Sequence, residues 1–71
     1  MSREPVESSS IRSIGYDPMS KMMEVEFNKG AVYVYEDVPE DVYHTLMTSE
    51  SIGRAFSELI KSAGYTYELK G

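Results

Sequence analysis

The sequence predicts an α+β domain: a three-stranded antiparallel meander, two helices packed on one of its faces, and a C-terminal fourth strand, in the order β-β-β-α-α-β. Three observations predict this fold. The stretch KMMEVEF alternates between apolar and polar residues, as a strand with one buried face does. The tripeptide NKG that follows is typical of a hairpin loop and leads into a further strand, AVYVYE. Residues 39–63 then carry apolar side chains at helical spacing.

The first predicted strand follows a short tail. Residues 1–8 are polar and contain Pro5, so we expect a flexible tail there and a single domain over residues 9–70. The stretch SIRSIGY alternates with the period of a strand, and YDPMSK then turns the chain. This alternation puts Ile14, Tyr16 and Arg12 on one face and Ile11 and Ser13 on the other.

The length of the hairpin loop decides which face its tyrosines occupy. In a three-residue loop with Gly30 in the left-handed conformation, Val25 lies opposite Tyr33 and Met23 lies opposite Tyr35. Both tyrosine rings are then on the apolar face. A two-residue loop, KG, would turn both rings to the face of the glutamates. We favour the three-residue loop because it fits the position of the glycine better.

Two helices and the last strand complete the predicted fold. The first helix begins around Pro39, with Glu40 and Asp41 at the positive end of its dipole. After the break TSES, a second helix runs to about Ala63, and Gly64 ends it. The closing YTYEL alternates again and predicts a strand. One face of this strand carries Tyr65, Tyr67 and Leu69.

The composition limits the classes of function. The chain has 71 residues, no cysteine, and a net charge of −5. Without cysteine there is no disulfide, thiolate zinc site or thiol nucleophile. The negative charge opposes a phosphate backbone, so we do not expect DNA binding. No apolar run reaches the roughly 18 residues of a membrane span. We expect a cytoplasmic protein without cofactors, either a monomer or a weak homo-oligomer.

Several short motifs follow one another in an order that is specific as a set. They are SSSI (Ser8–Ile11), IGYD (Ile14–Asp17), VEF (Val25–Phe27), YVYEDVP (Tyr33–Pro39), VY (Val42–Tyr43) with Leu46, and SIGRAF (Ser51–Phe56) with Ile60. Together they resemble the KTSC domain, a family found at the C-terminus of some lysyl-tRNA synthetases and as stand-alone bacterial and phage proteins. The resemblance implies a role that is uncharacterised, for which the synthetase fusion suggests RNA binding. The sequence departs from the family pattern at Ser57, where asparagine is usual, and at Lys61, where arginine is common.

Aromatic and basic side chains form one candidate site. If Tyr33 and Tyr35 were exposed, their rings could stack on bases. The favoured register instead places both rings in the core. A mixed arrangement, with the rings buried and the hydroxyls at the rim of a cleft, is compatible with both the binding role and the core role. Arg54 and Lys61 share the outer face of the second helix, where both can pair with Glu58 or, alternatively, attract phosphate. The candidate ligand-binding residues are Tyr33, Tyr35, Arg12, Arg54 and Lys61.

The open face of the sheet is the other candidate surface. Acidic side chains lie beside exposed valines there, which suggests contact with a protein or with a second copy of the chain. The sole histidine, His44, has no nucleophile or second ligand beside it, and the acidic turn at Pro39 lacks the glycine of a metal loop. We therefore assign no catalytic residue and no metal site. The candidate protein-contact residues are Glu24, Glu26, Val32 and Val34.

The function that we predict is a small non-enzymatic binding or adaptor module. On grounds of charge its partner is a protein, and RNA is the alternative that the family resemblance implies. A further alternative is an oligomer that sequesters a nucleotide or another small molecule between tyrosines of two subunits. An enzyme has the least support, because no pair of residues has the right types for acid–base or nucleophilic chemistry.

Overall fold

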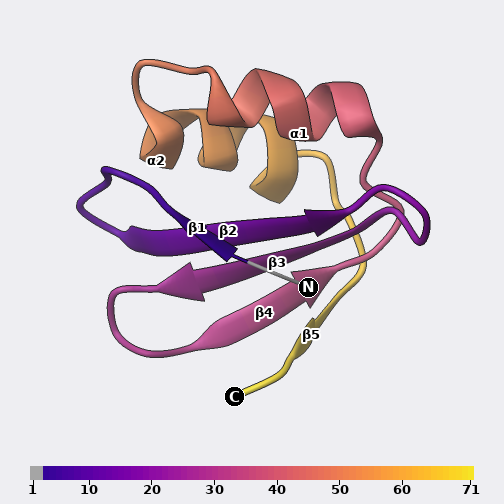
Figure 1. Cartoon of the computed structure of the whole chain (residues 1–71), viewed down its shortest axis with the longest axis horizontal. Helices are drawn as coiled ribbons and strands as arrows, with labels where there is room; N and C mark the ends of the chain where they lie inside the picture. The colour runs from indigo at the N-terminus through magenta and orange to yellow at the C-terminus, as the bar shows by residue number, and fades with distance from the viewer. Residues whose placement is uncertain (1–2) are drawn as a thin grey trace.

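An antiparallel sheet of five strands forms one layer of the fold, and the helices cover one face of it (Figure 1). The structure, a computed structural model, describes residues 3–71. The strand order β1-β2-β3-β4-β5 follows the chain. The predicted α+β class, with its meander, two helical segments and returning last strand, is confirmed. The elements are β1 (Arg3–Pro5), β2 (Ile11–Asp17), β3 (Met22–Phe27), β4 (Val32–Tyr35), α1 (Glu40–Met47), α2 (Ile52–Phe56), the π-helix η1 (Ser57–Lys61) and β5 (Tyr67–Leu69).

The additional strand, β1, lies within the stretch for which the sequence predicts a flexible tail. Arg3 lies opposite Gly15 and Pro5 opposite Ser13. A strand of two charged residues and one proline is too short for a period of two to be visible, and proline is tolerated there because β1 is an edge strand. Residues 1 and 2, at the start of the expected tail, lie outside the described residues.

The strand β2 contains a bulge that changes which side chains face the core. Ile11 lies opposite Phe27, but Ser13 already lies opposite Glu26, so Arg12 is an extra residue without a partner in β3. The extra residue brings Ile11 onto the same face as Ile14, and both are buried in the core. The predicted placement of Ile11 on the face of Ser13, with Arg12 on the face of Ile14, is therefore wrong.

The hairpin between β3 and β4 has the favoured three-residue loop. The amide of Gly30 donates to the carbonyl of Phe27 at 2.9 Å, and Gly30 has a φ of +100°. Val25 accordingly lies opposite Tyr33, and Met23 opposite Tyr35. The predicted register is confirmed, and the rings of both tyrosines lie on the side of the sheet that the helices cover.

The second predicted helix has two parts. After the short α2, the chain widens into η1, where the amide of Ser62 donates to the carbonyl of Ser57 at 3.2 Å, five residues back. Phe56 and Ile60 are buried against the sheet, whereas Ala63, to which the sequence predicts that the helix extends, is exposed two residues beyond the end of η1. The buried core consists of Ile11, Ile14, Met23, Val25, Tyr35, Val38, Leu46, Phe56 and Ile60.

Candidate functional site

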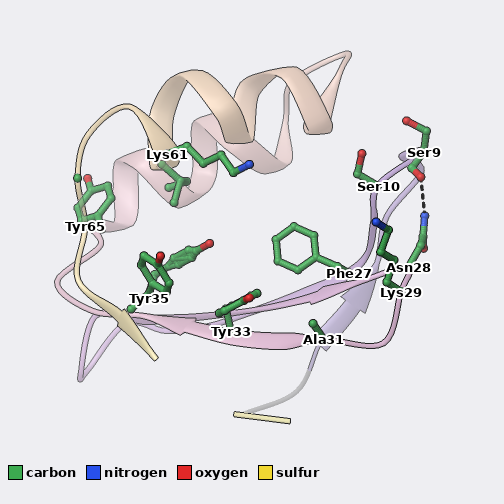
Figure 2. Close-up of a pocket in the computed structure, with 13 residues that line it drawn as sticks. Ser9, Ser10, Phe27, Asn28, Lys29, Ala31, Tyr33, Tyr35, Lys61 and Tyr65 are labelled. Carbon is green, nitrogen blue, oxygen red and sulfur yellow. Dashed lines mark hydrogen bonds between the residues drawn. The ribbon is translucent and has the colours of Figure 1, made fainter. Parts of the chain in front are cut away.

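A groove with a volume of about 790 Å³ opens between the helical layer and the end of the sheet formed by β4 and β5 (Figure 2). The sheet contributes aromatic side chains to the groove, and η1 and the segment after it contribute the opposite side. Its lining residues are Ser9, Ser10, Phe27, Asn28, Lys29, Ala31, Tyr33, Tyr35, Ile60, Lys61, Gly64, Tyr65 and Tyr67.

Aromatic rings from three strands pack against one another along the sheet side of the groove. The ring of Tyr33 meets Phe27 edge-on at a centroid distance of 5.7 Å and Tyr67 at 5.5 Å. Tyr35 lies between Tyr67, on which it stacks at 5.4 Å, and Phe56, which it meets edge-on at 5.5 Å. Cross-strand pairing brings these rings together, because Tyr35 lies opposite Tyr67 in the β4–β5 ladder.

The rings differ in how far they reach solvent. Tyr35 is only 6% exposed, and burial, followed by its neighbours Tyr67 and Tyr33, raises the pKa of its phenol. Tyr33 is half-buried and Tyr67 is 58% exposed. Tyr35 is therefore part of the core that also touches the groove, whereas Tyr33 and Tyr67 offer accessible ring surface.

Two lysines carry positive charge at the groove. Lys61, at the end of η1, extends from the helical side into the groove (Figure 2), and Lys29 lies in the β3–β4 loop at the other end. Neither forms a salt bridge with another residue between 3 and 71. Their ammonium groups are available to an anionic ligand.

At the end of the groove near Lys29, the side chain of Asn28 connects the hairpin loop to the serine segment before β2. The amide group of Asn28 donates to the carbonyls of Ser9 at 2.9 Å and Ser8 at 3.3 Å. The backbone amide of Asn28 also donates to the carbonyl of Ser10 at 2.8 Å. These bonds hold the serine segment against the hairpin and fix the shape of this end.

Comparison with known proteins relates these features to a family. The family model described as the KTSC domain matches residues 7–67. The chain belongs to the KTSC domain family. The crystal structure of a KTSC domain protein from Yersinia pestis matches this KTSC domain with a TM-score of 0.91 and 41% identity, over 99% of this chain and 97% of that chain. The resemblance that the sequence motifs indicate is therefore confirmed.

Relatives include stand-alone proteins and a segment of a larger enzyme. An uncharacterized protein of Stutzerimonas stutzeri is 46% identical over 67 residues, which are 94% of each chain. A lysine–tRNA ligase of Nostoc punctiforme is 34% identical over 55 residues, which are 78% of this KTSC domain and 10% of the ligase. The names of the stand-alone relatives indicate no enzymatic function.

The groove of this KTSC domain brings together Tyr33, Tyr35 and Lys61 of the five predicted ligand-binding residues. The other two lie elsewhere. Arg12 does not line the groove: it is 3.9 Å from a carboxylate oxygen of Glu26 and donates to the carbonyl of Asn28. Arg54 is exposed on α2, and its Nε donates to Glu58 at 3.2 Å.

Sequence reasoning missed other groove residues, which the structure adds to the site. The alternation of YTYEL already placed Tyr65 and Tyr67 on one face of the last strand, but the strand to which they pair was not assigned. Phe27 precedes the hairpin loop and Lys29 lies within it, so the sequence predicts them only as a core residue and a turn residue. The added residues are Phe27, Lys29, Tyr65 and Tyr67.

The side chains on the open face of the sheet are less exposed to solvent than the sequence predicts. Glu24 is only 4% exposed, and both its oxygens are occupied by cationic side chains. Glu26 accepts a 2.9 Å hydrogen bond from the hydroxyl of Ser13. Val32 and Val34 are half-buried. The glutamates therefore mainly serve the sheet itself, and the valines are what this face offers to a partner.

Two further properties hold for residues 3–71. No helix in this range is long and apolar enough to span a membrane. No group of three or more histidine, aspartate or glutamate side chains in the same range is arranged to hold a metal ion. The aromatic groove is the feature of the described chain that best fits a ligand.

Proposed function

We propose that this KTSC domain is a non-enzymatic module that binds unpaired RNA bases in its aromatic groove. The observation that carries the proposal is the composition of the groove, in which accessible tyrosine rings lie beside two lysines. An unpaired nucleotide has the matching chemistry, because it presents a flat aromatic base and a negative phosphate within a few ångströms.

Stacking would supply most of the affinity. Each base stacked on an aromatic side chain contributes roughly 1–3 kcal/mol, whatever its sequence. Tyr33 and Tyr67 have the exposed ring area for this contact, and the buried Tyr35 supports them from the core. The proposed role thus divides the two tyrosines of the hairpin: Tyr33 contacts the base and Tyr35 holds the platform in place.

The charge of the chain makes the proposed binding local and weak. A net charge of −5 repels a long phosphate backbone, but Lys29 and Lys61 provide positive charge at the groove. If the two lysines neutralise two phosphates, the logarithm of affinity should fall with the logarithm of salt concentration with a slope of about −1.4. This small slope is the electrostatic signature of the proposal.

The family adds support from outside the structure. One relative of this domain is a segment of a lysine–tRNA ligase, an enzyme whose name includes its RNA substrate. A small domain joined to such an enzyme would be useful if it held unpaired RNA near the catalytic unit. The stand-alone form would use the same groove on free RNA.

The half-buried Val32 and Val34 support a second candidate function, contact with a protein through the open face of the sheet. This alternative has lost part of its basis, because Glu24 is engaged by Arg3 and Lys70 and is not available to a partner. It predicts that Val32→Ser with Val34→Ser abolishes binding to the partner and leaves RNA binding unchanged.

The test of the main proposal is fluorescence anisotropy with a labelled single-stranded RNA of about eight nucleotides. Separate arms compete with a duplex of the same sequence and with nucleoside monophosphates, which distinguishes an RNA strand from a free nucleotide. We expect saturable binding to the single strand that duplex RNA does not displace, and weaker displacement by monophosphates.

Variants locate the site in the same assay. Tyr33→Leu and Lys61→Gln should each weaken binding several-fold, while Tyr33→Phe should retain it because the ring remains. Arg54→Gln is the matched control, since it removes one exposed positive charge from the outer face of the same helical segment. Binding that is absent, or that falls equally in Arg54→Gln and Lys61→Gln, would refute the groove as the binding site.

A further inference from the structure

A single row of paired residues crosses the open face of the sheet from one edge to the other. The row ends at Glu68, and Lys70, two residues further along the chain, lies on the same face of the sheet. The row consists of Arg3 in β1, Gly15 in β2, Glu24 in β3, Val34 in β4 and Glu68 in β5.

Glu24 is the centre of this row and binds Arg3 at one end of it and Lys70 just beyond the other end. Arg3 donates to Oε1 of Glu24, and Nζ of Lys70 donates to Oε2 at 2.7 Å. Gly15, which lies between Arg3 and Glu24 in the row, has no side chain that would block the arginine. A carboxylate that is 4% exposed is thus neutralised from both edges of the sheet.

The tie to Lys70 matters because it links β5 to β3, whereas the backbone hydrogen bonds of β5 and its flanks, such as that from the amide of Lys70 to the carbonyl of Val32 at 2.6 Å, reach β4 alone. The strand β5 is an exposed three-residue edge strand. Among the described residues, the bond between Lys70 and Glu24 is the one side-chain hydrogen bond that joins residues 63–71 to the rest of the chain. Short edge strands of this kind open at low free energy.

We propose that Glu24 is a positioning residue for the aromatic groove: through Lys70 it holds β5, and with it the ring of Tyr67, against the sheet. The effect on ligand binding rests on the proposed function, whereas the effect on β5 does not. Tyr67 stacks on Tyr35 and meets Tyr33 edge-on, so movement of β5 opens the side of the groove. A residue on one face of the sheet thereby controls a site on the other face.

The two edges of the sheet provide a matched pair of variants. Lys70→Met and Arg3→Met each remove one positive charge from the same carboxylate and leave the other partner in place. Only Lys70→Met releases the edge that carries Tyr67. Glu24→Gln weakens both ties at once.

Amide hydrogen exchange in the full chain tests the proposal. In Lys70→Met we expect exchange in residues 67–71 to accelerate by about tenfold, while β1 keeps its wild-type rates. Arg3→Met should accelerate β1 alone, and Glu24→Gln should accelerate both. Unchanged exchange of β5 in Lys70→Met, or equal acceleration of β5 in Arg3→Met, would overturn it.

Binding of the single-stranded RNA to the same variants tests the link to the groove. Lys70→Met and Glu24→Gln should lose several-fold in affinity, and Arg3→Met should bind as the wild type does, although it has lost the same charge as Lys70→Met. If exchange of β5 accelerates in Lys70→Met as expected, but Lys70→Met and Arg3→Met bind the RNA with equal affinity, Glu24 does not position the groove. If the wild-type protein binds no RNA, the proposed function fails, while the exchange rates still decide whether Glu24 holds β5.

Discussion

The ring of Tyr67 stacks on the ring of Tyr35 with centroids 5.4 Å apart and ring planes inclined by 23°. The contact joins the last strand to the hairpin and makes one wall of the groove from two distant parts of the chain. It also gives the two neighbouring tyrosines of β4 different roles, since Tyr35 is covered by this contact and Tyr33 is not.

The first prediction concerns this division of roles. Tyr35→Ala should lower the free energy of unfolding by about 3 kcal/mol, because it removes a buried ring between Tyr67 and Phe56. Tyr33→Ala should cost about 1 kcal/mol, since its ring is half-buried. Urea unfolding of both variants measures the difference. Equal losses would contradict the assignment of Tyr35 to the core and Tyr33 to the groove.

The second prediction concerns acid stability. The hydrogen bond from Lys70, with the nearby charges of Lys70 and Arg3, holds the pKa of Glu24 below its ordinary value of 4.5. The ionised form is therefore favoured in the folded state, so its contribution to stability is complete above pH 4.5 and is lost as pH falls through the lowered pKa. Glu24→Gln should lower stability at neutral pH and flatten the fall below pH 4.5.

The urea midpoint as a function of pH measures this effect. Glu50→Gln is the control, because Glu50 is exposed between α1 and α2 and forms no salt bridge within residues 3–71. It should keep the wild-type profile. A Glu24→Gln profile that is parallel to the wild type through the acid range would show that the bridges to Glu24 contribute nothing.

The third prediction concerns the hairpin turn. Gly30 has a φ of +100°, and a Cβ at this position would meet no atom within 4 Å. Gly30→Ala should therefore lose about 1 kcal/mol through backbone strain alone. Gly71→Ala, which also adds a methyl group in open space, serves as the control and should be neutral. Thermal unfolding measures the stability of both variants. Equal stability of Gly30→Ala and Gly71→Ala would argue against the three-residue loop.

The fourth prediction concerns the stacked pair that joins the sheet to α1. The ring of Tyr16 stacks on Tyr43 with centroids 4.6 Å apart, and its hydroxyl donates to the carbonyl of Val38. Tyr16→Phe should cost about 1 kcal/mol, because the ring stays and the hydrogen bond is lost. Tyr43→Phe should be close to neutral, since the hydroxyl of Tyr43 has no partner within the described residues. Chemical denaturation measures the free energy of unfolding of both variants. An equal loss of stability in Tyr16→Phe and Tyr43→Phe would contradict a stabilising role of the hydrogen bond from Tyr16 to Val38.

The sequence predicts the parts of the fold that depend on local chemistry. The loop NKG and its glycine set the register of the hairpin, and that register places Tyr33 and Tyr35 on the covered face. The same local signals do not reveal β1 or the bulge at Arg12, because the three residues of β1 are too few to show a period and an inserted residue breaks the period of β2.

The site is less predictable than the fold because it depends on pairing between distant segments. Tyr67 reaches Tyr35 only because β5 pairs with β4, and Lys70 reaches Glu24 across the same sheet. A strand pattern shows that Glu24 faces away from the helices, but it does not show that a glycine in β2 leaves the path to Arg3 open. The burial of Glu24 follows from the small Gly15 beside it together with the side chains of Arg3 and Lys70 that cover it.

An NMR titration of the labelled full chain with single-stranded RNA at low salt tests the central claim most directly. It should follow the tyrosine ring signals and the valine methyl signals, because these side chains distinguish the two faces of β4 where backbone amides do not. We predict saturable shifts of the rings of Tyr33 and Tyr67, with the methyl signals of Val32 and Val34 unchanged. Shifts confined to the valine methyls, or no shifts at all, would contradict the claim that the aromatic groove binds unpaired RNA bases.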